Sequence, residues 1–203
     1  MPKLLIISLN GDPLGQYGTE HAGGQVKYIL ELGRYLVREG WEIDVFTIRN
    51  GETSKESVVT EGFNIVRFSL PNEKDYSYSI SEFDITTINT SIASYVIDNK
   101  CQYNLLLCCY WLSGIVGLSL REIIQRKMLM SFCSLGYFKR VLSDMPESLD
   151  ARIETEKYIA QNCDHIIATS SEEKNVLIAE YRVSSDKISV IPRGVDLNVF
   201  YKY

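Results

Sequence analysis

Two adjacent glycines, Gly23 and Gly24, precede an amphipathic segment and could form an anion-binding site. Glycines at the start of a helix leave backbone N–H groups unobstructed by a Cβ, and the helix dipole adds partial positive charge there. A phosphate group is the usual ligand of such a place. The alternative is a tight turn that only leads into the helix. The elements around the pair decide between these interpretations.

Apolar runs rich in branched residues alternate with helical patterns along the chain. The runs are nearly continuous, as expected of parallel strands covered on both faces, and they predict strands at 3–9, 42–47, 63–69, 103–108, 128–132, 165–169 and 188–191. Helical periodicity predicts helices at 24–39, 81–99, 112–125, 149–162 and 172–181, and the polar segment 50–62 reads as a loop or an edge hairpin. This alternation predicts an α/β fold, a Rossmann-like open, mostly parallel sheet with helices on both faces.

Composition and charge narrow the class of protein. The chain has 203 residues, 45% hydrophobic and 23% charged, which suits one globular domain or lobe. Its formal charge of −5 argues against a nucleic-acid partner. No apolar run is long enough for a transmembrane helix, which leaves only peripheral membrane contact open. Gly11, Gly15 and Gly18 do not form the G-x-G-x-x-G pattern, which disfavours a dinucleotide-dependent oxidoreductase.

The cysteines and histidines point to a reduced, cytoplasmic protein without a histidine-rich metal site. The five cysteines are odd in number, none is in C-x-x-C spacing, and no secretion signal precedes them. The adjacent Cys108 and Cys109 are no evidence for a disulfide, since neighbouring residues rarely bridge without strain. Only two histidines, His21 and His165, are present.

Four passages together carry a family pattern. They are 23–32 followed by 40–47, 110–114, 134–136 with Lys139, and 152–154 followed by 166–171 and 190–196. In order and spacing they resemble the N-terminal domain of a retaining GT-B glycosyltransferase of family 4, with sucrose-phosphate synthase and sucrose synthase as the most similar branch. The resemblance covers nearly the whole chain.

The resemblance implies two lobes that bind a nucleoside diphosphate sugar as donor and a sugar or sugar phosphate as acceptor. A hexose is then transferred with retention of configuration, with no cofactor and no essential metal. Residues 1–196 are expected to form the acceptor-side lobe, with Gly23 and Gly24 at the donor phosphates. Residues 197–203 are expected to begin a linker to a C-terminal lobe that is missing here, so we expect the isolated chain to be inactive.

Two positions depart from the family pattern. Cys109 and Cys133 stand where the family carries a histidine, one before Tyr110 and the other before Ser134. A thiol is a weak hydrogen-bond donor and behaves as a small apolar group, so the catalytic residue stays unassigned. Buried, inert thiols are the simplest interpretation, because a redox role needs a low pKa and exposure, which the sequence does not reveal. The departures also motivate an alternative function, a non-catalytic module that binds a sugar phosphate or a nucleotide sugar.

Four residues are candidates for contact with the acceptor. Lys139 and Arg152 match the family pattern and would meet an anionic acceptor. Their alternatives are a surface lysine and an ion pair within or beside the helix of Arg152. His21 lies in the loop before the glycines, where it either contacts the acceptor or is an ordinary loop histidine without a role in binding. Tyr110 either packs at a strand end or stacks on a sugar.

Overall fold

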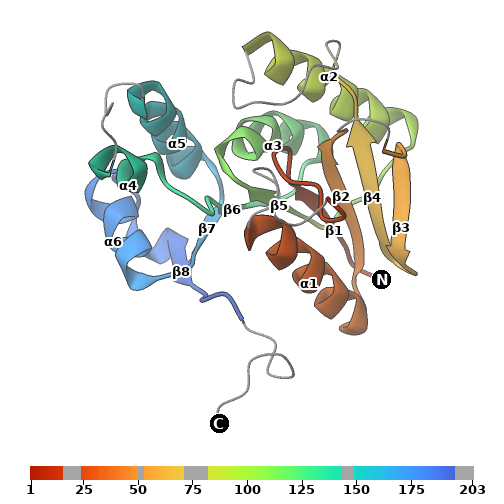
Figure 1. Ribbon diagram of the computed structural model, residues 1–203, viewed down its shortest axis with the longest axis horizontal. Helices are drawn as coiled ribbons and strands as arrows, with labels where there is room; N and C mark the ends of the chain where they lie inside the picture. The colour runs from red at the N-terminus through yellow and green to blue at the C-terminus, as the bar shows by residue number, and fades with distance from the viewer. Residues whose placement is uncertain (16–23, 50–52, 71–81, 143–148, 195–203) are drawn as a thin grey trace.

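The computed structural model describes residues 1–15, 24–49, 53–70, 82–142 and 149–194, which form one sheet flanked by helices (Figure 1). The strands are β1 (Lys3–Ile7), β2 (Glu42–Ile48), β3 (Glu56–Thr60), β4 (Phe63–Phe68), β5 (Leu105–Cys109), β6 (Met128–Ser131), β7 (His165–Ala168) and β8 (Ile188–Val190). The helices are α1 (Gly24–Arg38), α2 (Glu82–Asp98), α3 (Trp111–Ile124), α4 (Gly136–Val141), α5 (Asp150–Asn162), α6 (Ser171–Ala179) and the short 3-10 helix η2 (Ser185–Lys187).

The strand order is β3-β4-β2-β1-β5-β6-β7-β8. Every neighbouring pair is parallel except β3 and β4, which form an antiparallel hairpin at one edge. From the central β1 the chain builds outward through β2 and β4, and β5 then starts the other half on the opposite side of β1. The predicted Rossmann-like, mostly parallel sheet is therefore confirmed, and the hairpin interpretation of segment 50–62 holds for β3.

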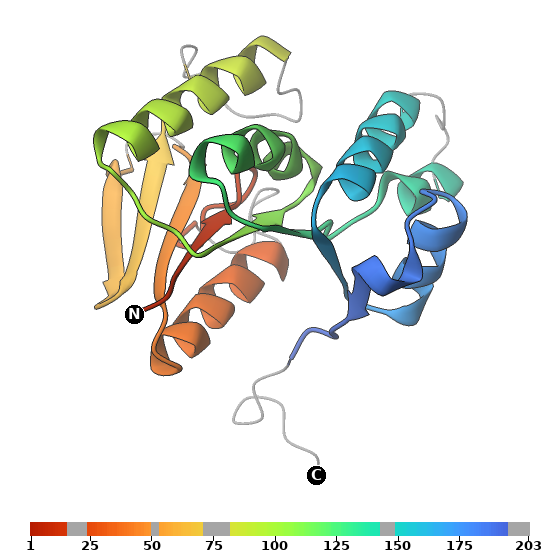
Figure 2. The ribbon, with the colours of Figure 1, turned by 180° about the vertical axis from the view of Figure 1, so that it is seen from behind.

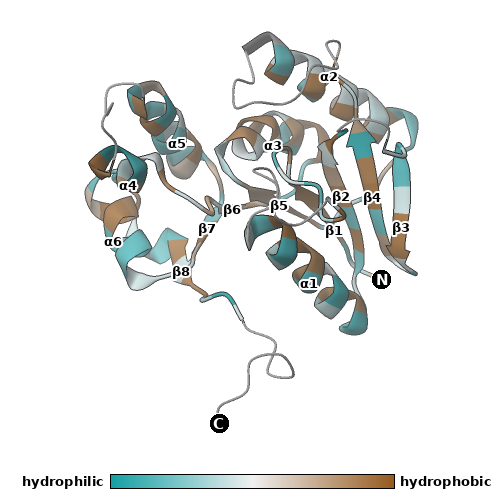
Figure 3. Ribbon diagram, in the orientation of Figure 1, coloured by the Kyte–Doolittle hydropathy of each residue, from teal (hydrophilic) through white to brown (hydrophobic). Residues whose placement is uncertain are grey.

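Helices cover both faces of the sheet (Figures 1 and 2). On one face, α1 packs Ile29 and Leu30 against buried side chains of β1, β2 and β4. On the other face, α2, α3 and α5 contribute to a larger core that includes Phe46, Val116 and Ile159. Figure 3 shows the corresponding pattern, with hydrophobic residues along the central strands and a mixture of hydrophobic and hydrophilic residues on the helices. Burial of this apolar surface is the main force that holds the layers together.

Two glycines let helices lie close to the sheet. A Cβ on Gly33 in α1 would lie 2.4 Å from a ring carbon of Phe63 in β4. A Cβ on Gly117 in α3 would lie 2.2 Å from the Sγ of Cys108 in β5. Both distances are too short for real carbon contacts, so the close packing of α1 and α3 requires glycine at these positions.

The predicted elements appear within about two residues of their expected ends, and α4 is an addition. The passage 134–136 leads directly into this helix, which begins at Gly136. The five cysteines are free thiols, so Cys108 and Cys109 do not bridge. None of the helices in the described part of the chain is both long and apolar enough to cross a bilayer.

Candidate functional site

The candidate site lies at the carboxyl edge, by which we mean the residues that directly follow the parallel strands. The strand order reverses between β1 and β5, because β1 leads outward to β2 on one side while β5 begins the other half. Doubly wound sheets bind their ligands outside the carboxyl ends of the strands at such a point. The predicted site residues that the structure describes follow β5 and β6 or begin α1, α4 and α5.

The start of α1 meets an arginine from the other end of the chain. Arg193 follows β8, and its Nη1 would lie 3.4 Å from a Cβ added to Gly24. Its guanidinium carbon is 5.0 Å from the ring centroid of Tyr28, one turn into α1, which is a cation–π distance. The first turn of α1 carries no acidic side chain. The helix dipole and Arg193 therefore add positive charge at one place, which suits an anion. Gly23 and His21 lie outside the described residues.

Gln25 ties the first turn of α1 to the loop after β1. Its side-chain amide donates to the Oγ of Ser8 at 3.0 Å and to the Oδ1 of Asn10 at 3.1 Å. The amide of Asn10 donates back to the Oε1 of Gln25 at 3.4 Å. These bonds hold the helix start against the end of β1, so the position of Gly24 does not depend on the preceding loop alone.

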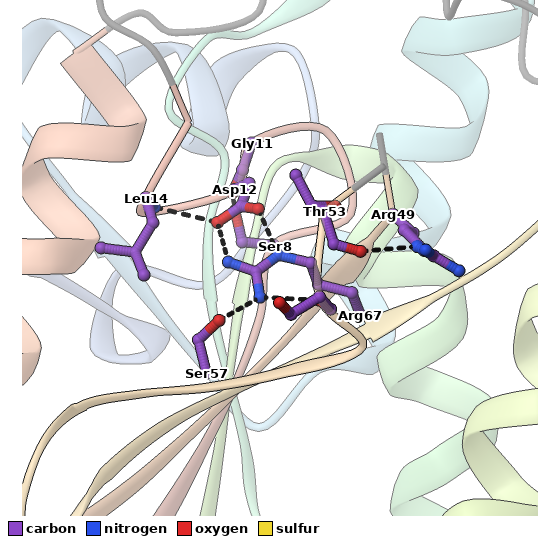
Figure 4. Close-up of polar contacts among 9 residues, drawn as sticks. Ser8, Gly11, Asp12, Leu14, Arg49, Thr53, Ser57 and Arg67 are labelled. Atoms are coloured by element: carbon purple, nitrogen blue, oxygen red, sulfur yellow. Dashed lines mark hydrogen bonds and ion pairs between the residues drawn. The ribbon is translucent and has the colours of Figure 1, made fainter. Parts of the chain in front are cut away.

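The same loop is anchored by a buried ion pair between Asp12 and Arg67 of β4 (Figure 4). The Nε of Arg67 donates to one carboxylate oxygen at 2.5 Å and its Nη2 donates to the other at 3.2 Å. The Oγ of Ser57 and the carbonyl oxygen of Ser54 accept from the Nη1 of Arg67 at 2.7 and 3.1 Å. Asp12 also accepts from the backbone N–H of Leu14. Sequence reasoning missed this pair, because nothing local links a loop aspartate to a strand arginine.

Tyr110 and Arg152 are brought together at the end of β5. Tyr110 has φ 77° and ψ 153°, a region that non-glycine residues rarely occupy and that costs on the order of 1–3 kcal/mol. Its ring centroid lies 5.0 Å from the guanidinium carbon of Arg152. Its backbone N–H donates to the carbonyl oxygen of Ser131 in the neighbouring β6. This strained turn directs Tyr110 to the same place as the arginine of α5.

Arg152 makes the predicted ion pair within its helix, and the partner is Glu156. Its Nε donates to the Oε1 of Glu156 at 2.7 Å, and its Nη2 donates to the carbonyl oxygen of Ser134 at 2.6 Å. The other oxygen of the fully buried Glu156 accepts from the backbone N–H of Gly136 and from the hydroxyl of Tyr181. Glu156 thus fixes Arg152 and the start of α4 together. Its position four residues after Arg152 was the available sequence signal.

Lys139 lies on the exposed side of α4, close enough to Arg152 for the two charges to interact. Partial burial lowers the pKa of Lys139, and the positive charge of Arg152 lowers it further, against an opposing effect of Glu156. Each cation would be stabilised by an anion placed between them. Lys139, Arg152 and Tyr110 therefore form one group, which we call the α4–α5 cluster.

Cys109 and Cys133 also meet, at the ends of the neighbouring strands β5 and β6. Cys109 is fully buried and Cys133 is partly buried. The two thiols lie close enough for their side chains to interact, and the positive charge of Arg193 acts on both. Tyr28 faces the same thiols, and its burial raises the pKa of its phenol to about 12. The expected buried thiols are therefore found here, but Cys133 is not shielded like Cys109.

The structure thus groups the described candidates into two sets. The first contains Gly24 and the two cysteines, joined by Arg193, which the sequence reasoning did not single out although it lies in the 190–196 passage. The second is the α4–α5 cluster. The described residues contain no group of three or more histidine, cysteine or carboxylate side chains arranged to hold a metal ion.

Comparison with known proteins gives a consistent match. The model of a family described as Glycosyltransferase Family 4 matches residues 22–199. A D-inositol 3-phosphate glycosyltransferase of Corynebacterium glutamicum is 29% identical over 202 residues, covering 98% of this chain and 48% of the relative. A mannosylfructose-phosphate synthase of Agrobacterium fabrum is 29% identical over 216 residues, covering 98% of this chain and 47% of the relative.

Among solved structures, a sucrose-phosphate synthase from Thermosynechococcus elongatus superposes with a TM-score of 0.81 at 30% identity. The match covers 100% of this chain and 51% of that one. The chain therefore spans about half the length of the relatives that it matches.

Proposed function

This chain belongs to glycosyltransferase family 4, and from that premise we propose that it is the acceptor-side lobe of an enzyme that transfers a hexose to a phosphorylated acceptor. The donor in this proposal is a nucleoside diphosphate sugar, and the configuration at the transferred carbon is retained. The observation that carries the proposal is the α4–α5 cluster. Two cationic side chains and an aromatic ring meet there at the carboxyl edge, where this fold class binds ligands.

A phosphorylated acceptor fits the chemistry of the cluster. Arg152 is held rigidly by Glu156, while Lys139 extends from the exposed side of α4. A phosphate bound near both would receive charge-assisted hydrogen bonds and relieve the repulsion between the cations. The ring of Tyr110 would then lie beneath the sugar. The names of the three relatives also support this class of ligand, since each contains a phosphate: inositol 3-phosphate, mannosylfructose-phosphate and sucrose-phosphate.

The first set of residues suits the donor side of the reaction. A leaving nucleoside diphosphate develops negative charge, which preorganised N–H groups and cations stabilise. In our proposal the start of α1 and Arg193 supply this stabilisation, and no cofactor or essential metal is required. Cys109 and Cys133 supply no imidazole, so we expect neither of them to act as a general base at the reacting sugar.

Binding to the 203-residue chain tests the acceptor assignment directly. Thermal shift and calorimetry would compare hexose phosphates, inositol phosphate, the unphosphorylated sugars, inorganic phosphate and nucleoside diphosphates. We expect stabilisation by phosphorylated sugars, because a ligand that binds only the folded state raises its stability. Equal responses to phosphorylated and unphosphorylated sugars would contradict the proposal.

Two neighbouring basic residues of α4 provide a matched pair of variants. Lys139→Ala should weaken sugar-phosphate binding about tenfold, which corresponds to one lost charge-assisted hydrogen bond of roughly 1.5 kcal/mol. Arg140→Ala should change it less than about twofold, because Arg140 pairs at the surface with Asp150. Equal losses in the two variants would indicate nonspecific attraction to basic side chains.

A non-catalytic module that binds the same sugar phosphate is the second candidate. The observation that favours it is the pair of thiols where the family pattern has histidines, one of them fully buried. Binding is expected in both cases, so transfer must decide. In a protein that joins this chain to a donor-binding lobe, measurable transfer of labelled hexose would favour the enzyme. Its absence, unchanged by Cys109→His with Cys133→His, would favour the binding module.

A further inference from the structure

We propose that Cys109 and Cys133 form an oxidisable dithiol at the carboxyl edge, in which Cys133 reacts with a peroxide and Cys109 closes the disulfide. The proposal does not depend on sugar transfer. It rests on the contact between the two thiols, on the backbone that holds them and on the cation beside them. The other cysteines of the chain provide internal controls.

The register of β5 and β6 explains why the contact is unusual. Cys109 pairs with Ser131, so Cys133 is two residues beyond the partner of Cys109. An extended strand would carry residue 133 about 6–7 Å further along. Instead, Cys133 adopts φ 61°, a left-handed conformation that is uncommon for a residue with a side chain. The turn brings its thiol back to β6, where it donates to the carbonyl oxygen of Ser131 at 3.7 Å. The same oxygen accepts from the backbone N–H of Tyr110, the residue after Cys109, so the two cysteines lie close enough for their side chains to interact.

The surroundings of the two thiols shift their pKa values in opposite directions. Interaction with the side chain of Cys109 lowers the pKa of Cys133, and the positive charge of Arg193 lowers it further, while burial and the carboxylate of Glu173 oppose these effects. The same interaction and complete burial raise the pKa of Cys109. Tyr28, the remaining titratable group at this place, is neutral at physiological pH. Cys133 is therefore the more acidic thiol of the pair, and Cys109 is the thiol that holds its proton more tightly.

Access distinguishes this pair from the remaining cysteines. Cys108 and Cys163 are buried, and burial raises the pKa of both. Cys101 is partly exposed like Cys133, but it precedes β5 and so lies at the opposite edge of the sheet. Because a reactive cysteine needs both thiolate character and access, only Cys133 combines them with a neighbouring thiol among the described residues.

The oxidation is balanced with hydrogen peroxide as the two-electron oxidant. The Cys133 thiolate attacks one peroxide oxygen, the O–O bond breaks, and the leaving hydroxide takes a proton to become water. The sulfur of Cys109 then attacks the resulting sulfenic acid. An S–S bond forms, the S–O bond breaks, and the proton of Cys109 leaves with the hydroxide as a second water. A dithiol reductant reverses the step by thiol–disulfide exchange.

Mass analysis of the peroxide-treated chain tests the pairing. We expect the intact chain to lose two hydrogen masses. After non-reducing digestion, the peptide containing Cys109 should be joined to the peptide containing Cys133. Cys109→Ser should abolish the link and leave a sulfenic acid on Cys133 that dimedone traps, and Cys108→Ser should leave the link intact. No link, or a link between other cysteines, would overturn the proposal, and the wild-type map requires no variant to fold.

Alkylation rates test which thiol reacts. At neutral pH, iodoacetamide should modify Cys133 faster than Cys101, which is also partly exposed, by about threefold for each unit by which its surroundings lower the pKa of Cys133. The tenfold gain in thiolate is partly offset by weaker intrinsic nucleophilicity. Arg193→Met should slow Cys133 and leave Cys101 unchanged, while Arg193→Lys should restore most of the rate. Equal rates at Cys133 and Cys101, or no effect of Arg193→Met, would refute the assignment of Cys133.

Discussion

Replacement of Asp12 by alanine should destabilise the fold far more than the loss of an ordinary surface ion pair. The side chain of Arg67 is only 3% exposed, and that of Asp12 is 11% exposed. Removal of the carboxylate leaves a buried guanidinium with the carbonyl of Ser54 and the hydroxyl of Ser57 as acceptors. A buried pair that loses one partner costs about 3–5 kcal/mol. We expect about 4 kcal/mol, a large share of the roughly 5–15 kcal/mol by which a domain is stable.

Urea unfolding followed by circular dichroism measures this loss as a lower midpoint with an unchanged slope. The control is Glu154→Ala, which breaks the exposed pair with Lys157 and should cost about 0–1 kcal/mol. Asp12→Ala combined with Arg67→Met removes both charges, so the double variant should be more stable than Asp12→Ala alone. Two results would show that the buried pair does not anchor the loop. One is a loss of unfolding free energy in Asp12→Ala that is no larger than in Glu154→Ala. The other is a loss in the double variant that equals the sum of the losses in Asp12→Ala and Arg67→Met.

Three further predictions concern packing, ionisation and the arginine of the α4–α5 cluster. Gly33→Ala should lower the free energy of unfolding by about 1–3 kcal/mol despite better helix propensity, because its Cβ would lie 2.4 Å from the ring of Phe63; a stabilised variant in urea unfolding would contradict this. The folded-state pKa of Tyr28 is raised from 10.0 to about 12, so its contribution to stability is present below pH 10 and lost as pH rises towards about 12; tyrosinate absorbance of the wild type minus Tyr28→Phe should show this late titration, and an ordinary pKa would refute the burial argument. Arg152→Ala should cost about 3–5 kcal/mol, because it leaves the carboxylate of Glu156 buried with neutral partners; calorimetric unfolding checks this, and an unchanged stability would place its role in binding alone.

Much of the fold could be predicted because the signals are local. Strands such as β1 and β2 are continuous apolar runs, and α1 carries its apolar residues at a helical period, so short-range chemistry reports their type. Helix α4 escaped prediction because its six residues are too few to establish a period. Its start is held by Glu156, twenty residues away in the chain. A contact at that separation leaves no periodic trace in the sequence.

The candidate site was predicted as separate residues and assembled only by the tertiary structure. The sequence indicated Lys139, Arg152 and Tyr110 through a family pattern, and it identified the two thiols as departures from that pattern. It did not reveal that Arg193 reaches the first turn of α1, because those residues come from opposite ends of the chain. Parallel strands bring such distant segments to one edge, and sequence spacing alone does not show which side chains then touch.

By itself, the sequence determined the class of fold, the family pattern and the residue types available for binding an anion. These follow from periodicity, turn residues and order along the chain. Only the tertiary structure decided which groups interact. It pairs Arg152 with the buried Glu156, and it brings Cys133 close enough to Cys109 and Arg193 for both to affect its pKa. The physical reason is that pKa, burial and pairing depend on distances through space. Whether a thiol is inert or reactive therefore depends on its exposure and on the groups that surround it.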